Sequence, residues 1–248
     1  MPSTRLVSTM HVGSPGAPPP VVLSVGGSVL VTGEHDEAYL RALAGLLQGF
    51  GGEVPLVVTT GGGRTAREYI ALGRGLGLTE VELDELGIDV TRLHARLLAG
   101  VIGSPTSTHP ATTISEAVRE AHRHSPVIVG GTEAGHTTDG VAALLAVRLK
   151  AGRVVNATSV AGLYDGDPRT RADARRIDRM DWEQFRQIVR AAAGHGSPGQ
   201  QFVFDALGAE SLARARIPLS ILAGRDLAAL EAALRGRPFP GTVVGGPR

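Results

Sequence analysis

Five short apolar segments interrupt the more polar remainder of the chain and predict buried β-strands. They cover residues 21–25, 55–60, 126–130, 153–160 and 218–224. Their hydrophobic residues follow one another without alternating with polar ones, which is typical of parallel strands that helices cover on both faces. The segments therefore predict the strands of one buried sheet.

Between these segments, hydrophobic residues recur at the spacing of amphipathic helices. The clearest series are Leu86, Val90, Leu93 and Leu97, and then Val141, Leu144, Leu145 and Leu149. We expect Gly152 to be the C-cap of the second helix, because glycine is common where helices end. The alternation of strands and helices predicts an α/β fold, a three-layer αβα sandwich with a mostly parallel central sheet.

Glycine-rich turns follow three of the predicted strands, at residues 26–28, 61–63 and 130–131. We expect helices after the second and third turns, and after the first turn following a longer loop. Ligands of open α/β sheets bind at the carboxyl ends of the strands, where helix N-termini present free N–H groups. Three such turns on one edge predict a long cleft for one or two ligands that carry several phosphates.

The second turn lies in the stretch PLVVTTGGGRTAREYI, residues 55–70. It lacks the lysine of a P-loop and the last glycine of a dinucleotide-binding motif, which excludes both of these sites. Arg64 and Arg67 lie about one helical turn apart, and a guanidinium beside the free amides can bind phosphate in place of lysine. The alternative for the glycines is a turn that serves only close packing between strand and helix. The alternative for the arginines is a solvated position on the helix surface, which fits Arg64 better than Arg67.

The third turn leads into the sequence GHTTDG, where we expect a helix to begin. Thr137 or Thr138 can serve as its N-cap, and Asp139 can complement the helix dipole. Together with Thr132 and His136, these residues also concentrate hydrogen-bonding side chains around one turn. Such a concentration suits a phosphate or the edge of a nucleobase.

Two further segments carry candidate polar groups. In LDELGIDVTRLHARLL, residues 83–98, we expect Asp84 just before a helix that carries Arg92 and Arg96 one turn apart. Asp84 either caps this helix or accepts hydrogen bonds from a ribose diol. The sequence GLYDGDPRT, residues 162–170, forms either a plain surface turn or a loop for adenosine or metal-bound phosphate.

Composition excludes several classes of protein. The chain has 248 residues, of which 42% are hydrophobic, a formal net charge of +1 and no cysteine. These values fit one large domain or two closely joined lobes, exclude disulfides and a thiol nucleophile, and favour neither nucleic acid nor an anionic membrane as partner. We expect a cytoplasmic protein without a secretory signal or membrane span, preceded by a flexible or polyproline-like leader.

Lysine is almost absent from the chain. Lys150 is the only lysine, so the 25 basic residues include 24 arginines. A cationic phosphate clamp must therefore consist mainly of arginine, backbone amides or metal.

Common hydrolase motifs do not occur in the sequence. There is no G-x-S-x-G elbow and no H-E-x-x-H helix. His122 and His124, which could in principle bind a metal, fit better on a solvated helix end.

In this order, the motifs resemble those of the amino acid kinase superfamily, and most closely those of the archaeal-type uridylate (UMP) kinases. The resemblance covers roughly residues 21–244, and its most specific strings are GGSVL, GGGRTAREYI, LDELGIDVTRLHARLL, GHTTDGVAALLA and NATSVAGLYDGDPRT. It implies ATP-dependent phosphorylation of UMP to UDP in pyrimidine biosynthesis, with magnesium (Mg2+) as cofactor and a homohexameric assembly. The corresponding division is a leader over 1–20, a UMP-binding lobe over about 21–150 and an ATP-binding lobe over about 151–248.

The resemblance also implies roles for individual residues. The residues implied to bind ATP are Gly27, Ser28, Gly63, Arg67, Thr158, Tyr164 and Asp167. The residues implied to bind UMP are Gly62, Asp84, Thr132, Glu133, Ala134, Gly135, His136, Thr137 and Thr138. Arg67, Asp139 and Asp205 are the candidate catalytic residues. Arg67 would neutralise the transferred phosphoryl group, and the two aspartates would order magnesium, its waters or the basic groups.

Three features depart from the family pattern. Many members have Asn-Val-Asp-Gly where this chain has Ser159, Val160, Ala161 and Gly162, related archaeal chains often have lysine in place of Glu210, and the first glycine turn lacks the lysine of many superfamily members. The alternative functions are another small-molecule kinase of this fold and a nucleotide- or oxyanion-binding protein without turnover. The changes near the ATP site favour the latter, whereas Asp84 and the threonine-rich turn argue against the former.

Overall fold

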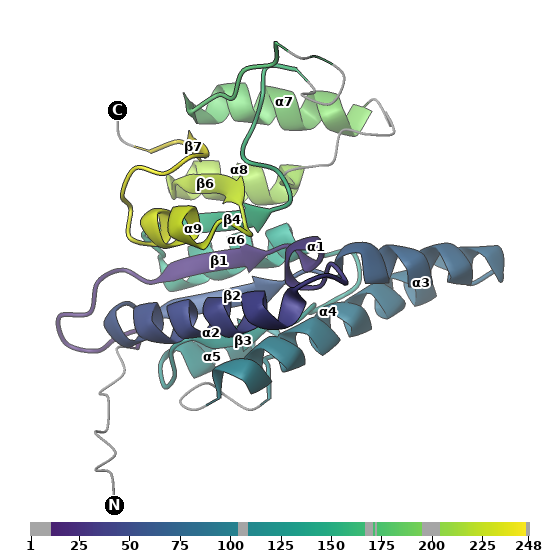
Figure 1. Cartoon of the computed structure of the whole chain (residues 1–248), viewed down its shortest axis with the longest axis horizontal. Helices are drawn as coiled ribbons and strands as arrows, with labels where there is room; N and C mark the ends of the chain where they lie inside the picture. Colours follow the sequence, from purple (N-terminus) through teal and green to yellow (C-terminus); the bar gives the residue numbers. More distant parts are fainter. Residues whose placement is uncertain (1–10, 104–108, 167–170, 172, 195–203, 247–248) are drawn as a thin grey trace, which may run out of the picture.

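The computed structural model describes residues 11–103, 109–166, 171, 173–194 and 204–246. Within them, one sheet has the strand order β3-β2-β1-β4-β6-β7-β5 (Figure 1). The strands are β1 (Val21–Val25), β2 (Leu56–Thr60), β3 (Val127–Val129), β4 (Arg153–Thr158), β5 (Arg179–Met180), β6 (Leu219–Ala223) and β7 (Thr242–Val244). The five apolar segments correspond to β1, β2, β3, β4 and β6, which run parallel to one another, so these predicted strands are confirmed.

Two short strands at one side of the sheet were not predicted. β7 pairs antiparallel with β6, and β5 pairs parallel with β7. β5 contains two residues and β7 contains three. Unlike the equally short β3, which lies inside the apolar run 126–130, β5 and β7 are flanked by polar residues, glycine or proline, so no continuous apolar run marks them in the sequence.

Helices alternate with the strands along the chain. The helices of the described residues are α1 (Gly27–Leu30), α2 (Asp36–Glu53), α3 (Gly63–Gly75), α4 (Glu80–Ile102), α5 (Ile114–Ala121), α6 (Thr138–Leu149), α7 (Trp182–Gly194), α8 (Ala206–Ala215) and α9 (Leu227–Leu234). The two amphipathic series predicted from hydrophobic spacing correspond to α4 and α6.

The core lies in two layers, one on each face of the sheet. On β1, Val22 packs with buried residues of α5, α6, α7 and α8, whereas the next residue, Leu23, packs with those of α1, α2, α4 and α9. Figure 1 shows α2 and α9 in front of the sheet and α6 behind it. Because successive side chains of a strand point to opposite faces, both faces of the central strands are buried. The predicted three-layer αβα architecture is therefore confirmed.

One predicted helix boundary was wrong, and one short helix was not predicted. The helix expected after the first glycine turn and a longer loop corresponds to α2, which begins at Asp36, but the four-residue helix α1 already begins within the turn at Gly27. The C-cap of α6 is Lys150, which adopts the left-handed conformation (φ 52°) and donates its N–H to the Ala146 carbonyl. Gly152 lies beyond this cap, directly before β4. Its N–H donates to the Pro20 carbonyl (2.9 Å).

The described part of the predicted leader, residues 11–20, lies against the domain. Val12 N–H donates to the Ala121 carbonyl (2.9 Å), and the His122 side chain contacts the Val12 carbonyl (2.9 Å). His122 is the C-cap of α5, which agrees with its predicted position at a helix end. Among the described helices, none combines the length and the apolar character that crossing a membrane requires.

Candidate active site

The first two glycine turns touch each other at the level of the backbone. They follow the adjacent strands β1 and β2, and Gly61 N–H donates to the Val25 carbonyl (2.8 Å). A Cβ atom on Gly27 would overlap the Gly61 carbonyl oxygen and the Gly63 nitrogen. Gly63 also has a positive φ of 60°, which favours glycine. The two turns therefore require glycine for contact, and their helices α1 and α3 start side by side.

Helix α4 fixes the second and third turns from one side. The Thr91 hydroxyl accepts the N–H of Gly131 (2.6 Å), and the Thr91 carbonyl accepts the hydroxyl of Thr60 at the end of β2 (2.9 Å). The buried His94 contacts the Gly61 carbonyl through Nδ1 (2.8 Å). Sequence reasoning missed Thr91 and His94. The available signal was their spacing, because polar residues that share a helix face with Leu98 must be buried with partners.

The two arginines of α3 have different neighbours. Arg67 donates from Nη2 to the Ser28 hydroxyl (3.3 Å), so its guanidinium extends across the contact between the first two turns. Arg64 donates to the Thr32 carbonyl (3.2 Å) and pairs with Glu68 (3.4 Å) at the exposed surface. Arg67 therefore contacts the first glycine turn, whereas Arg64 contacts the loop after α1, and the role of Arg67 as a phosphate ligand remains a prediction.

A cluster that the sequence did not predict holds the loop after α1. Thr32 and Gly33 donate their backbone N–H groups to Asp36 Oδ2 (2.9 and 2.7 Å), and Arg225 pairs with Oδ1. Burial raises the pKa of Asp36, but these hydrogen bonds outweigh it and hold the pKa well below its ordinary value. Asp36 is therefore ionised and anchors the loop beside the first glycine turn.

The expected position of Asp84 relative to its helix was wrong. Helix α4 begins at Glu80, and its N-cap is Thr79, which forms a reciprocal capping box with Glu82. The T-x-x-E pattern was present in the sequence and is a known start signal. Asp84 therefore lies inside the first turns of α4, and its Oδ2 accepts the N–H of Gly135 (3.0 Å). This bond joins α4 to the threonine-rich loop.

The loop between β3 and α6 carries most of the residues implied to bind UMP. Thr137 is confirmed as the N-cap of α6, since its hydroxyl accepts the Gly140 N–H (2.9 Å). Thr132 is 7% exposed, and its hydroxyl is buried without a hydrogen-bond partner among the described residues. Arg92 supports this segment by donating to the carbonyls of Gly131 and Thr132 (3.1 and 3.3 Å).

The other implied residues of this loop are mostly exposed. Thr138 is partly buried, and the exposed residues are Glu133, Ala134, Gly135 and His136. Arg96, one turn after Arg92 on α4, is also exposed. These groups are free to meet a ligand, whereas Thr132 is buried and Arg92 is partly buried.

Asp139 and Asp205 lie together beneath the start of α6. Asp139 is directed inward, where its Oδ1 accepts the hydroxyl of the buried Ser24 on β1 (2.9 Å). Asp205 is the N-cap of α8, and it also accepts the hydroxyl of Thr137. Burial raises the pKa of Asp139 to about 7 against the lowering effect of the Ser24 hydrogen bond, and the negative charge of Asp205 adds to the rise.

The remaining residues implied to bind ATP, Thr158, Tyr164 and Asp167, are only partly brought to these turns. Thr158 ends β4, and its Cα would lie 3.9 Å from a Cβ on Gly26, so it borders the first turn. Tyr164 forms an isolated bridge with Arg176. The backbone hydrogen bonds of its segment run to residues 175–177 and not to the glycine turns. Asp167 lies outside the described residues.

Comparison with known protein families gives the class of this protein. The model of the amino acid kinase family matches residues 19–221. The chain therefore belongs to the amino acid kinase family, as the motifs predicted.

Within this family, the chain is similar to proteins named uridylate kinase. One from Methanospirillum hungatei is 38% identical over 91% of this chain and 94% of its own length, and one from Thermoplasma volcanium is 40% identical over 90% and 96%. The crystal structure of uridylate kinase from Archaeoglobus fulgidus has a TM-score of 0.79 at 35% identity and covers 91% of this chain and 99% of that one. A UMP kinase from Bacillus anthracis shares the fold (TM-score 0.73, 19% identity, 91% and 95% covered). The predicted resemblance to archaeal uridylate kinases is confirmed.

Proposed function

We propose that the protein is a uridylate kinase, which transfers the γ-phosphoryl group of ATP to UMP and releases UDP and ADP. The observation that carries this proposal is the backbone contact of the first two glycine turns, with Arg67 and Ser28 across it. Two turns with free amides in contact give adjacent sites for two phosphate groups, which a donor and an acceptor nucleotide require. The similarity to uridylate kinases supports the same conclusion.

The transfer requires little covalent chemistry from the protein itself. An oxygen of the UMP phosphate forms a bond to the γ-phosphorus of ATP, while the bond from that phosphorus to the β–γ bridging oxygen breaks. Because the attacking oxygen is already ionised, catalysis consists mainly of in-line positioning and stabilisation of the transferred charge. In this proposal, the backbone amides of Gly27 and Gly63 and the guanidinium of Arg67 supply that stabilisation.

On the acceptor side, UMP lies between α4 and the threonine-rich loop. Asp84, which already accepts the Gly135 N–H, has capacity to accept hydrogen bonds from the ribose hydroxyls. The Thr132 hydroxyl, which has no partner among the described residues, provides a buried polar contact. The remaining assigned contacts are Gly62, Glu133, Ala134, Gly135, His136, Thr137 and Thr138.

On the donor side, the phosphates of ATP lie over the first turn. Gly27, Ser28, Gly63 and Arg67 are assigned to them, and Thr158 to the nucleoside end beside β4. Tyr164 and Asp167 are assigned to ATP from the family resemblance alone.

Asp139 and Asp205 fit a magnesium ion. They are close enough that the charge of Asp205 raises the pKa of Asp139, so a nearby cation would favour the ionised form of Asp139. Proteins typically hold magnesium through one or two carboxylates together with substrate phosphates. Bound magnesium would neutralise phosphate charge during transfer. Ser24 and Thr137 orient the two carboxylates.

The test is a substrate panel with the purified full-length protein. UMP with Mg-ATP should give rapid ADP release, whereas CMP or AMP with Mg-ATP should not. No turnover with UMP over a wide range of pH and divalent metals would refute the proposal. Calorimetry that shows tight nucleotide binding without product would instead identify the non-catalytic binding protein.

We also propose that the chain assembles with copies of itself through α3 and α4. These two helices pack side by side, and α3 extends away from the sheet in Figure 1. Seven large hydrophobic residues of this helix pair and its connection are more than one-third exposed: Tyr69, Leu72, Leu76, Val81, Leu93, Leu97 and Val101. An exposed apolar surface of this extent typically marks a protein interface. The homohexamer remains the expectation from the family resemblance.

A further inference from the structure

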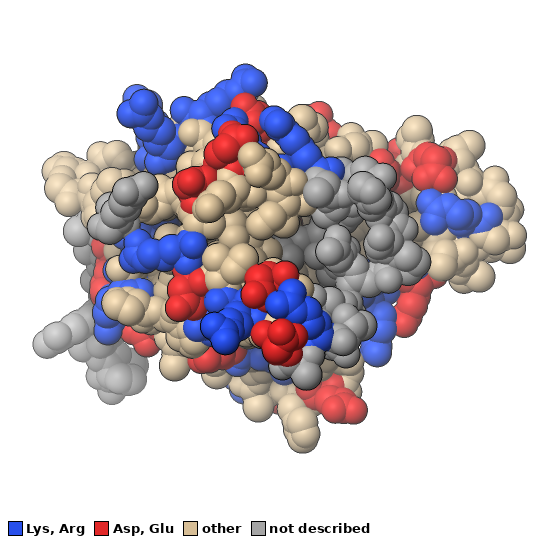
Figure 2. Space-filling model, turned by 90° about the horizontal axis from the view of Figure 1, so that it is seen from above, with Lys and Arg blue, Asp and Glu red and all other residues tan. Residues whose placement is uncertain are grey.

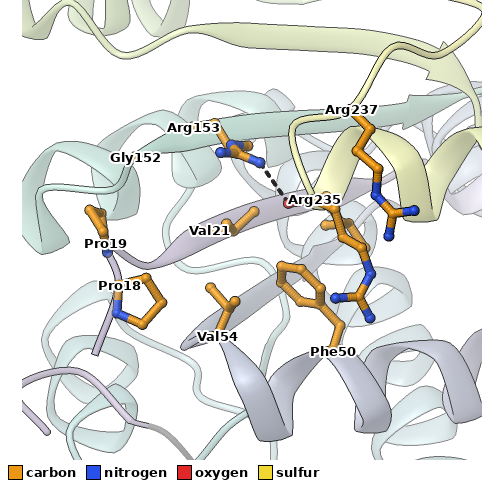
Figure 3. A pocket seen from close by; sticks show the side chains of 10 residues that line it. Pro18, Pro19, Val21, Phe50, Val54, Gly152, Arg153, Arg235 and Arg237 are labelled. Atoms are coloured by element: carbon orange, nitrogen blue, oxygen red, sulfur yellow. Dashed lines mark hydrogen bonds between the residues drawn. The ribbon is translucent and has the colours of Figure 1, made fainter. Parts of the chain in front are cut away.

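A cavity opens at the amino-terminal ends of the central strands, at the opposite end of these strands from the glycine turns. It lies beside Val21 and Arg153, the first residues of β1 and β4, and has a volume of about 420 Å³ (Figure 3). The glycine turns follow the carboxyl ends of the same strands. The cavity is therefore separate from the proposed nucleotide site, by the length of the five-residue strand β1.

Apolar side chains form one wall of this cavity. Pro18 and Pro19 come from the segment before β1, Phe50 and Val54 come from the end of α2, and Val21 lies between them (Figure 3). The proline segment is fixed there by the bond between Gly152 N–H and the Pro20 carbonyl (2.9 Å). The wall offers a flat, apolar contact surface to the body of a small organic molecule.

Three arginines line the other side, and they differ in how far their charge is neutralised. Arg235 pairs with Glu53 (2.7 Å) and Glu231 (2.9 Å), so its charge is neutralised within the protein. Arg237 lies 3.8 Å from Glu231 with 62% of its side chain exposed, which is a weak, solvated pair. The wall therefore carries an excess of positive charge.

Arg153 is the deepest source of that excess. Its Nη1 donates to the Leu234 carbonyl at the end of α9 (2.9 Å). Among the described residues, no carboxylate oxygen lies within 4.0 Å of its guanidinium. Partial burial lowers the pKa of Arg153 from its ordinary value, because the guanidinium has lost hydration without gaining a counter-charge. A ligand oxyanion would supply that counter-charge.

We propose that this cavity is a second ligand site, which binds a small organic anion. The phosphate or carboxylate group of the ligand pairs with Arg153, and Arg237 attracts it at the rim. Its apolar or aromatic body lies against Phe50, Pro18 and Pro19. Guanidinium groups bind either oxyanion in bidentate fashion, so the chemistry common to both defines the ligand class.

The test measures binding of phenyl phosphate and benzoate to the full-length protein, by calorimetry and by ligand-observed NMR. Both probes carry an oxyanion on an aromatic ring, and phenol serves as the uncharged comparison. We expect at least one of the two anions to bind, and phenol to bind about tenfold or more weakly. The anion that binds more tightly identifies the preferred oxyanion.

Four variants locate the binding site. Arg153→Gln removes the proposed counter-charge, and Val54→Phe fills the apolar side while keeping every charge. Both should weaken binding about tenfold or more. Arg41→Gln, an exposed arginine on α2 that pairs with Glu37, controls for the loss of one positive charge. Arg67→Gln tests whether the probe binds at the nucleotide site instead.

Binding that survives in the Arg41 and Arg67 variants and is lost in the other two supports the proposal. Loss only in the Arg67 variant, or no binding of either anion at millimolar concentration, overturns it. If circular dichroism shows that Arg153→Gln does not fold, the binding measured for Val54→Phe tests the proposal. The experiment does not require kinase activity, so its failure is distinct from failure of the proposed function.

Discussion

Arg64 and Arg67 are close on α3, but they make different contacts. Arg67 reaches Ser28 across the two touching turns, whereas Arg64 is held at the surface by Glu68 and the Thr32 carbonyl. Arg67→Gln should lower kcat/KM for UMP phosphorylation by about 100-fold or more, because a preorganised donor to the transferred group is lost. Arg64→Gln is the matched control and should cost only a few-fold. Steady-state kinetics that show equal losses in both variants would contradict this assignment.

Asp139 makes the unfolding free energy depend on pH. Its pKa is raised from 3.8 to about 7 in the folded protein, so between these values the folded state binds a proton that the unfolded state has released. Stability contributed by this proton is present at low pH and is lost as the pH rises through about 7. A difference of this size corresponds to at most ~4 kcal/mol.

Asp139→Asn should remove this dependence. Between about pH 4 and pH 8, its unfolding free energy should fall less steeply with rising pH than that of the parent protein. Chemical denaturation without nucleotide or divalent metal measures the effect, and Glu34→Gln, at an exposed loop position, is the control. Parallel curves for the parent and the Asn variant would show that the carboxyl is not perturbed.

At the scale of elements, the contact between turns makes a sharp prediction about glycine. Gly27→Ala would force a methyl group into the Gly61 carbonyl and should destabilise the fold by about 1–3 kcal/mol, with loss of turnover. Gly45, inside α2, is exposed, and a Cβ added there would meet no atom within 4 Å. Gly45→Ala should stabilise the protein by about 0.5–1 kcal/mol. Thermal unfolding distinguishes the two, and similar shifts would contradict the contact.

The elements that the sequence predicted are those with a strong local pattern. The continuous apolar runs of the five predicted strands and the helical spacing of α4 and α6 require no knowledge of neighbours. β5 and β7 could not be found this way, because neither lies within a continuous apolar run of the sequence, and their pairing with neighbouring strands defines them. Lys150 was missed as C-cap because a non-glycine residue in the left-handed conformation has no sequence signature.

The same distinction applies to the site. The glycine turns, Arg67 and the threonine-rich loop were predictable, because they follow strands and carry ligand-binding groups. The bonds from Thr91 and His94 to these turns, and from Ser24 to Asp139, depend on packing between distant segments. Assignment of Thr132 and Asp84 to UMP remains a prediction that the substrate panel and site variants must test.

At the scale of the whole molecule, the exposed apolar residues of α3 and α4 predict the route of assembly. Leu72→Glu and Leu93→Glu should each reduce the mass of the assembly in solution, because a charge cannot be buried there without a partner. Leu207→Glu, on α8, is the control, since Leu207 is 81% exposed but lies away from these helices. Light scattering after size-exclusion chromatography measures the mass. An unchanged assembly in both α3–α4 variants would exclude this face.

The surface gives no reason to expect assembly or binding through net charge. Figure 2 shows blue and red residues interspersed over the face that it presents, in line with a formal net charge of +1. We therefore expect any self-association to use the exposed apolar residues of α3 and α4. The charge excess at Arg153 is local in the same way.

The order of the strands has a consequence for how this protein behaves when it is concentrated or refolded. The described sheet ends in β3 on one side and β5 on the other, which contain three and two residues. Short borders expose few unpaired backbone groups, so they are poor templates for adding strands from another molecule. The longer central strands, which would offer more unpaired backbone groups, each have a neighbouring strand on both sides. We therefore expect the native protein to resist fibril-type growth.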